Sequence, residues 1–516
     1  MKKSNLFKAV GIVILSYVLL SWIIPIINSI GGFKWEVSNQ LGFVSTVFNV
    51  LNSLPTFIPV ITFVLLVGAF YGVLKATGAY DKIIDLFSSK VVGREKLLLI
   101  LVIILMALVS SVVGLDLGLL IVFPILIGLL VKVGYDKMVA LSATLGATII
   151  GMYGATFSIS LYGVNNQILD LKTFNQIIPK VVFFVLGLAG LIAFVLMYCK
   201  KNGLPASNKG DNKEVKVSSK KSDKVKKSSV KRGKDRKSKG VKKAPKIHKE
   251  RGERSAVPAL IVIGIMILIA LLGTTNWSGL IGSENWFATA HSAWTGFTIG
   301  KFDLLNKLFG LENIGAFGTW AEPTIRFQVY SILLIYAMII ISLLYRTKFE
   351  DSFDGFVDGL KSFIVPAVLV VLALSLHLFV YFNDVLTPVM NALLKSTKEF
   401  NVAISGIYII INSLFYVDYY YFASFIVYPI TQVYEDKSVL SILSVMFANL
   451  YSLVMLVAPS SVLLLVSLSI SEVKYKDWLK FIWKFALGLL LVSFVVFTIM
   501  LLVWLWKVQF LHFFCV

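Results

Sequence analysis

The sequence of 516 residues has little charge, since Asp, Glu, Lys and Arg make up only 15% of it, against about 25% in soluble globular proteins. It also has only two cysteines, Cys199 and Cys515, which lie far apart in the chain, so a framework of disulfides is excluded. In contrast, 57% of the residues are hydrophobic and the mean hydropathy is +0.84. This composition excludes a soluble enzyme and predicts a membrane protein.

The charge that is present is concentrated in one segment. Between Lys200 and Arg254 there are 22 Lys and Arg but only six Asp and Glu, which is a net charge of +16 out of +21 for the whole chain. The segment is rich in Ser and Gly and has almost no large apolar residue, which predicts a disordered loop. Because the rest of the chain is nearly balanced, a specific nucleic-acid binder is excluded, and we expect a tether that contacts anionic lipid.

Apolar runs recur along the rest of the chain. A helix needs about 20 such residues to cross a bilayer, and the runs predict an all-α polytopic membrane protein with about nine full transmembrane helices. The predicted spans are 9–28, 56–74, 138–160, 179–199, 256–273, 327–345, 363–383, 439–468 and 483–507.

Two longer apolar stretches, 97–132 and 403–432, are broken near their middles. Loops rich in Lys and Arg stay on the cytoplasmic side, which places the N-terminus and 200–255 inside a plasma membrane and the C-terminus outside. This orientation requires each broken stretch to leave the membrane on the side where it entered, the first from inside and the second from outside. We therefore predict two opposed re-entrant hairpins.

Residue spacing supports an inverted repeat of these hairpins. Ser110 lies six residues before Asp116, and Asn412 lies six residues before Asp418. Interrupted helices in corresponding positions of two halves are a sequence indication of a transporter's binding site. The repeat divides the chain into a membrane half at 1–199, the loop at 200–255, and a membrane half at 256–516 with an outer loop at 274–326.

The polar residues at the interruptions are the candidate site. A carboxylate at bilayer depth costs about 2.5–3.5 kcal/mol or more, so the two Asp residues are functional candidates, whereas each Ser or Thr could simply bond to its own helix. His377 is expected to be a packing residue, with a proton relay as the alternative. Sodium or a proton is expected as coupling ion, with no other cofactor. The predicted solute-binding residues are Ser110, Ser111, Asp116, Thr156, Ser158, Asn412, Asp418, Ser424, Ser460 and Ser461, and the predicted coupling-ion residues are Asp116, Asn412, Asn449 and Ser452.

Three segments resemble a known family. They are GAFYGVLKATGAYDKIIDLF at 68–87, FPILIGLLVKVGYDKMVALSATLGATIIG at 123–151 and APSSVLLLVSLSISEVKYKDWLKF at 458–481. They resemble the YfcC/DcuC-type anaerobic dicarboxylate carriers of the ion transporter superfamily. The resemblance implies a homodimeric, elevator-type secondary carrier for an organic anion, an amino acid or a short peptide, coupled to sodium or protons.

The sequence departs from that family at both interruptions. Where the family commonly has Gly-Ser followed by Asn-Pro, this sequence has Gly154, Ala155, Thr156 and Phe157, and the predicted second hairpin is rich in tyrosine. The resemblance therefore implies the scaffold and leaves the solute open. Two alternatives remain at this point. One is an intramembrane aspartyl protease in which Asp116 and Asp418 share a proton, and the other is a membrane scaffold whose basic loop recruits partners.

Overall fold

The computed structural model describes residues 4–37, 40–172, 176–205, 255–281, 286–300, 303–310, 313–397, 399–416 and 418–514. The predicted basic loop at 200–255 lies outside these residues apart from 200–205 and Ser255. The described part of the chain is built from helices, as the composition predicts.

The helices of the first half follow the apolar runs and end where the sequence interrupts them. Short π-helical or 3-10 segments continue the helices at Val109–Val113, Leu117–Ile121 and Ser142–Gly146. The α-helices are α1 (Ser4–Gly31), α2 (Phe43–Thr56), α3 (Ile58–Ala76), α4 (Ala79–Lys90), α5 (Glu95–Leu108), α6 (Phe123–Lys132), α7 (Lys137–Leu141), α8 (Ala147–Gly154), α9 (Ile159–Ile168) and α10 (Ile177–Lys201).

The second half repeats this order of elements from α16 onwards. A long helix, a short amphipathic helix, an interrupted pair, a second interrupted helix and a final long helix follow each other, as they do from α3 to α10. A π-helical segment lies at Ala423–Val427. The α-helices are α11 (Val257–Thr274), α12 (Trp277–Ile281), α13 (Trp286–Thr295), α14 (Leu304–Phe309), α15 (Pro323–Leu344), α16 (Phe349–Phe382), α17 (Leu386–Lys395), α18 (Val402–Ser413), α19 (Tyr419–Phe422), α20 (Tyr428–Thr431), α21 (Lys437–Met455), α22 (Val462–Ser471) and α23 (Tyr475–Phe514).

Nine helices in the described ranges are long and apolar enough to cross a membrane, which agrees with the predicted number but not with every predicted span. The spans predicted at 138–160 and 439–468 are wrong as single helices. The first is interrupted at Ala155, whose positive φ of 34° ends α8, and the second is interrupted between α21 and α22, where Pro459 has no N–H to donate. The ninth long helix is Glu95–Val113, which lies within the broken stretch at 97–132, and whether this stretch re-enters the membrane stays a prediction.

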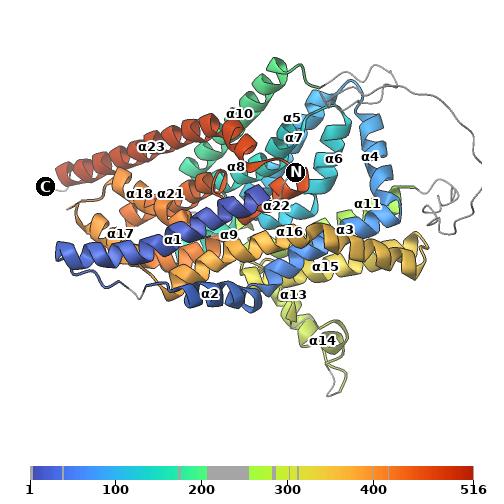
Figure 1. The fold of residues 1–516 in the computed structure, drawn as a ribbon, viewed down its shortest axis with the longest axis horizontal. Coiled ribbons are helices and arrows are strands. Elements are labelled where there is room, and N and C mark those ends of the chain that lie inside the picture. Colours follow the sequence, from blue (N-terminus) through green and yellow to red (C-terminus); the bar gives the residue numbers. More distant parts are fainter. Residues whose placement is uncertain are drawn as a thin grey trace, which may run out of the picture.

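Helices α3 and α16 form the closest helix pair of the core. A Cβ atom on Gly72 would lie 2.0 Å from the carbonyl oxygen of Gly355, and one on Gly359 would lie 2.3 Å from that of Gly68. No side chain fits at such distances, so the glycines allow the two backbones to touch. Helix α15 packs against α3 as well, and Figure 1 shows these three helices running together along the long axis of the molecule.

Burial separates central from peripheral helices. Almost every residue of α21 is buried, as are most residues of α3 and α16, whereas few residues of α1, α10 and α23 are buried. The exposed side chains of these three helices are large and apolar, which is the pattern of a surface that faces lipid. Helices α10 and α23 contact each other and lie on one side of the bundle, and α13 and α14 project from its opposite side (Figure 1).

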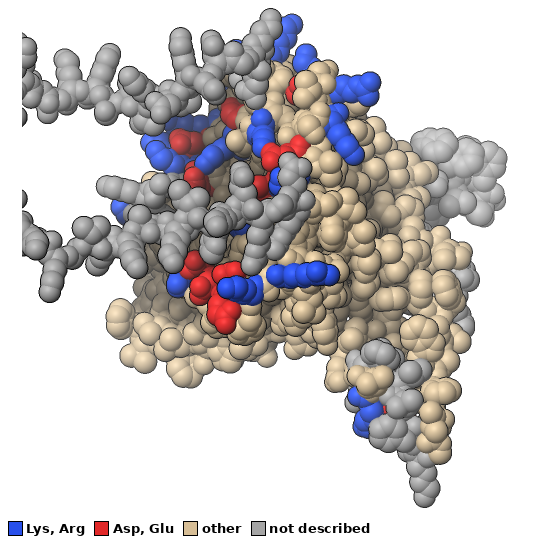
Figure 2. All heavy atoms as spheres, turned by 90° about the vertical axis from the view of Figure 1, so that its right-hand side faces the viewer, with Lys and Arg blue, Asp and Glu red and all other residues tan. Residues whose placement is uncertain are grey.

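Charged side chains gather at one end of the bundle. Figure 2 looks onto the end where α4 lies and shows Lys and Arg clustered there with Asp and Glu among them. Lys137 bonds to Glu472 at 2.8 Å there, which joins a loop of each half. At another contact between the halves, Lys437 bonds to Asp170 at 2.7 Å. The side of the membrane on which each end lies stays a prediction.

Candidate functional site

Asp116 and Asp418 occupy equivalent places in the two halves. Each follows an interruption and caps the short helix that comes next: the Asp116 carboxylate accepts a hydrogen bond from the N–H of Leu117 at 2.6 Å, and the Asp418 carboxylate accepts one from the N–H of Tyr420 at 2.9 Å. The interruption before Asp116 includes Gly114, whose φ of 83° is a left-handed conformation that favours glycine. The chain therefore turns both carboxylates into the interior.

A serine hydroxyl holds each interruption to the interrupted helix that follows it. In the first half Ser160 donates to the carbonyl of Gly114 at 3.0 Å, and in the second half Ser460 donates to the carbonyl of Leu414 at 2.7 Å. Both bonds join residues 46 positions apart. Backbone carbonyls freed by an interruption need a partner when they are buried, and the two halves meet this need in the same way.

Arg326 lies between the two carboxylates and is not among the site residues predicted from the sequence. Its Nη1 atom lies 3.7 Å from Oδ1 of Asp116, and its Nη2 atom lies 3.9 Å from Oδ2 of Asp418. The side chain of Arg326 is only 2% exposed, while those of Asp116 and Asp418 are 14% and 18% exposed. One guanidinium thus lies between an acid of the first half and an acid of the second.

The position of Arg326 in the chain explains why it was missed. The sequence predicts an outer loop up to residue 326 and a membrane span from 327, so Arg326 is the last residue of the predicted loop. Helix α15 instead begins at Pro323, where the Glu322 side chain accepts a bond from the N–H of Ile325. Arg326 is therefore inside the first helical turn. Two acids at membrane depth require a compensating cation. This requirement is the feature of the sequence that could have indicated a buried arginine beside them.

The guanidinium is paired in charge but not fully hydrogen-bonded. Its Nε and Nη1 atoms are buried and have no hydrogen-bond partner, and both ion-pair distances exceed the 2.7–2.9 Å of a charge-assisted hydrogen bond. A buried donor without a partner costs about 1–3 kcal/mol or more. Such N–H groups are suited to an incoming anion, which would give them acceptors.

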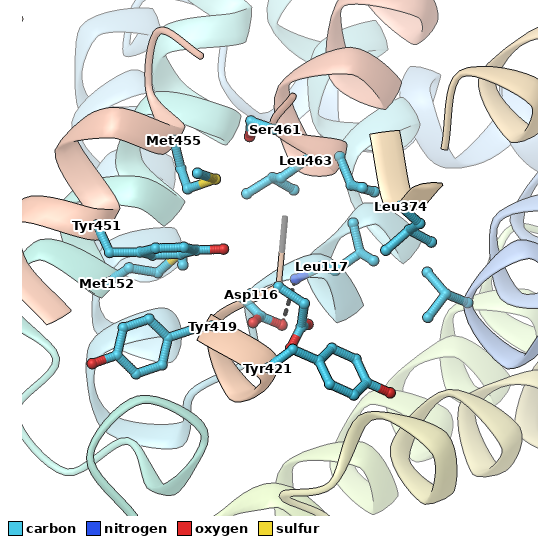
Figure 3. Close-up of a pocket in the computed structure, with 13 residues that line it drawn as sticks. Asp116, Leu117, Met152, Leu374, Tyr419, Tyr421, Tyr451, Met455, Ser461 and Leu463 are labelled. Carbon is cyan, nitrogen blue, oxygen red and sulfur yellow. Dashed lines mark hydrogen bonds between the residues drawn. The ribbon is translucent and has the colours of Figure 1, made fainter. Parts of the chain in front are cut away.

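A cavity of about 40 Å³ adjoins the two acids. A water needs about 10–15 Å³ by this measure, so the cavity has room for about three waters. Figure 3 shows Tyr451, Met455 and Tyr421 around Asp116, with Tyr451 and Tyr421 on opposite sides of it. The lining residues are Val60, Asp116, Leu117, Met152, Leu374, Asp418, Tyr419, Tyr421, Tyr451, Met455, Ser461, Val462 and Leu463.

Of the predicted site residues, only Asp116, Asp418 and Ser461 line this cavity. Ser461 mainly caps α22, where its hydroxyl accepts a bond from the N–H of Leu464 at 3.3 Å. The other predicted hydroxyls are engaged elsewhere. Ser110 donates to the Thr148 carbonyl, Ser111 pairs with Thr156, Ser158 pairs with Ser160, and Ser424 and Ser452 donate to carbonyls four residues earlier in their own helices.

The predicted coupling-ion residues do not converge on one point in this structure. Asn449 donates to the carbonyl of Tyr153 at 3.1 Å and accepts from Ser493 at 2.7 Å, which ties α21 to α8 and α23. Asn412 donates to the Tyr408 carbonyl of its own helix at 2.9 Å, and its Oδ1 atom is buried with no partner. Of these two asparagines, only Asn412 has a buried oxygen without a hydrogen-bond partner that could accept a cation.

His377 packs among aromatic rings, but its buried Nδ1 atom has no hydrogen-bond partner. It is 6% exposed, and its ring centroid lies 4.6 Å from that of Tyr421 and 5.5 Å from that of Phe425. It lines a second and larger hollow of about 350 Å³, formed by residues of α2 and α16 together with Tyr421 and Phe425. This hollow is an open groove, since Tyr381 and Phe382 in its wall are more than half exposed. Tyr421 lines both this groove and the cavity beside the two acids.

Comparison with known proteins gives three similarities. The family model described as "C4-dicarboxylate anaerobic carrier" (DcuC) matches residues 43–502. A curated protein of Haemophilus influenzae, described as an uncharacterized protein, is 25% identical over 144 residues, which is 28% of this chain and 28% of that protein. The crystal structure of the Alcanivorax borkumensis YdaH transporter covers 95% of this chain and 98% of that chain, with a TM-score of 0.41 and 12% identity.

Proposed function

Because this chain belongs to the C4-dicarboxylate anaerobic carrier family, we propose that it carries a small organic carboxylate across the membrane by binding it at Arg326. Family membership makes the protein a multi-pass membrane transporter and not an enzyme. The proposal adds the place of binding and the class of solute. It also includes coupling to a sodium or proton gradient, as expected from the sequence.

The observation that carries the proposal is the partly unsatisfied guanidinium between two carboxylates. A solute carboxylate can accept bonds from Arg326 in the two-pronged geometry that guanidinium groups favour. Because Asp116 and Asp418 compete for the same cation, binding of the solute is expected to loosen their ion pairs. The acids are then free to receive a coupling cation or a proton, which links the solute to the ion.

The position of the site supports transport rather than mere binding. Asp116 belongs to the first half and Asp418 to the second, and Arg326 lies on α15, outside both interrupted pairs. A relative movement of these parts would change both ion pairs together. We propose that solute and ion shift the equilibrium of this movement, because each of them changes which group is paired with the guanidinium.

The alternative of an intramembrane aspartyl protease is wrong, because the family consists of carriers. The geometry agrees with this correction. In a protease dyad two carboxylates share one proton, whereas Asp116 and Asp418 are both paired with the guanidinium of Arg326.

The partners expected from the sequence belong to the same proposal. We propose a homodimer that contacts anionic lipid through the basic loop at 200–255, with no specific nucleic acid as partner. The apolar exposed faces of α1, α10 and α23 provide surfaces for lipid or for a second copy.

A binding screen of the purified carrier tests the proposal. Dicarboxylates, amino acids, short peptides and nucleosides are added with and without sodium, and the shift of the unfolding temperature is measured. We expect stabilisation by at least one solute that bears a carboxylate, lost in Arg326→Gln and weakened at least tenfold in Arg326→Lys, which keeps the charge but not the two-pronged geometry.

Arg346→Gln is the matched control, since Arg346 follows α15 and is exposed. It is expected to bind as the wild type does. Stabilisation by nucleosides alone, or a carboxylate that binds equally well to Arg326→Gln, would contradict the proposal.

A further inference from the structure

Lys180 of α10 is a buried lysine without an acid. Of the Lys and Arg side chains that the structure describes, only those of Lys180, which is 1% exposed, and Arg326 are buried. Arg326 lies between two carboxylates, whereas none of the ion pairs between described residues includes Lys180. The ammonium lies instead over an aromatic ring, since its Nζ atom is 3.4 Å from the centroid of the Tyr162 ring.

The charged residues of α5 and α23 lie away from this ammonium. Both helices pack against α10, as α8 does. The charged side chains described in α23 are near its start, which adjoins the far end of α10, where Phe481 contacts Tyr198. In α5 the charged residues are Glu95 and Lys96 of the first turn, whereas its last turn is the part that approaches the end of α8. None of these charges therefore faces the buried lysine.

The other titratable groups of the adjoining segments are paired or exposed. In the loop before α10, Asp170 pairs with Lys437 and Lys172 is exposed. On α8, the hydroxyl of Tyr153 shares a hydrogen bond with α23. Tyr162 of α9 is thus the described titratable group that faces the ammonium, and its hydroxyl is buried without a hydrogen-bond partner.

Helix α9 connects the buried lysine with the interruptions of both halves. Tyr162 of this helix contacts the ammonium. Two residues earlier, Ser160 donates to the carbonyl of Gly114 in the first interruption. Three residues later, Asn165 donates to the hydroxyl of Tyr419, which directly follows the acid of the second half and lines the cavity beside the two acids, here called the charged cavity. A change at the lysine can therefore reach both parts of the site through one helix.

A lysine in such surroundings is suited to gaining and losing a proton. Taking an ammonium out of water is costly when no acid compensates for it, and lysine, unlike arginine, can give up its proton in a protein. The face of an aromatic ring attracts a cation, and a neutral amine lacks this attraction. Protonation therefore holds α9 against α10, and loss of the proton releases it.

From these observations we infer that Lys180 carries the coupling proton, at a place separate from the two acids. Its amine takes a proton from water on the side where the solute enters and returns it to water on the other side, so one N–H bond forms and breaks in each cycle. The inference rests on the proposed function, since a proton is coupled only if a solute is carried. It adds which ion is coupled and which residue carries it.

The charge of the proton has the sign that a carboxylate solute needs. Asp116, Asp418 and Arg326 together carry one excess negative charge when all three are ionised, and the solute adds more. A proton that enters with the solute offsets part of this charge where water is scarce. Solute and proton are therefore expected to move in the same direction.

Uptake into proteoliposomes tests the inference. The probe is succinate or, if succinate does not bind, the carboxylate that gives the largest shift in the solute screen. With the membrane potential clamped at zero and no sodium present, an inward tenfold proton gradient should drive accumulation of the probe by about tenfold for one proton per solute. Without a proton gradient, an inward gradient of the probe should acidify the interior, which a pH-sensitive dye reports.

Substitutions of Lys180 and its neighbour separate coupling from folding and binding. Lys180→Met should lose accumulation and acidification but still bind the probe and exchange it across the membrane. Lys180→Arg has a charge that cannot be given up and should bind the probe without accumulating it. Tyr162→Phe keeps the ring and should accumulate the probe as the wild type does. Lys484→Met is the matched control, because Lys484 is an exposed lysine that also lies over an aromatic ring, and it should change nothing.

The outcomes distinguish this inference from the proposed function. Accumulation that follows a sodium gradient alone would overturn the inference and leave the proposed function standing, as would accumulation under a proton gradient by Lys180→Met or Lys180→Arg. If Arg326→Gln takes up the probe as the wild type does, the proposed binding site fails, and the Lys180 variants still decide the inference. If no carboxylate of the screen enters wild-type vesicles, both fail.

Discussion

Replacing Arg326 by methionine should destabilise the protein, because it leaves two buried carboxylates without their cation. At separations of 3.7 and 3.9 Å, each pair is worth about 4 kcal/mol of Coulomb attraction at an effective dielectric constant of 20, before the cost of desolvation. Removal of one partner from a buried ion pair typically costs about 3–5 kcal/mol. We therefore expect Arg326→Met to lower the free energy of unfolding by about 3–5 kcal/mol.

The expected change can be measured by thermal unfolding in detergent. Unfolding entropy of about 2.1 cal/mol/K per residue means that 1 kcal/mol corresponds to about 1 °C in a chain of this length, so the unfolding temperature should fall by about 3–5 °C. The variant that combines Arg326→Met with Asp116→Asn and Asp418→Asn should recover most of this loss, since it has no uncompensated charge.

Arg346→Met removes an exposed arginine instead and serves as the control, with no expected change. The electrostatic explanation is refuted if the triple variant unfolds at the same temperature as Arg326→Met. It is also refuted if Arg326→Met is as stable as the wild type.

Three further predictions concern the acids, the core and the loop. Asp116→Asn and Asp418→Asn should abolish or uncouple uptake into proteoliposomes with normal membrane insertion, and wild-type uptake kinetics in both would show that neither charge is needed. Gly72→Ala should lower the unfolding temperature, because its Cβ atom would lie 2.0 Å from a backbone oxygen of α16, whereas Gly264→Ala, with nothing within 4 Å, should not. Deletion of 205–252 should leave uptake unchanged, and an inserted but inactive carrier would contradict this.

The interruptions of the helices could be predicted from the sequence because their causes are local. Gly114 ends one helix through its left-handed conformation, and Pro459 cannot donate to a helix. The six-residue spacing to Asp116 and Asp418 is also a property of the chain alone. In the structure each acid caps the helix that follows its interruption, so the predicted equivalence of the two positions corresponds to the same local structure.

The candidate site was predicted less well because a hydroxyl group in a helix can adopt either of two arrangements. A serine in an apolar helix can bond to a carbonyl four residues earlier, as Ser424 and Ser452 do, or it can face a cavity. Both arrangements occur with the same residue in the same sequence pattern. Which of them forms depends on the neighbouring helices. Ser461 alone among the predicted hydroxyls lines the charged cavity.

The sequence by itself determined the class of protein, the helices and the places where they break, since apolar length, glycine, proline and caps act within a few residues. Only the tertiary structure decided which polar groups meet. Arg326 is distant in sequence from both acids and is the last residue of a predicted loop, so no local pattern relates it to them. The physical reason for their meeting is that buried carboxylates need a cation, and α15 supplies one from outside both interrupted pairs.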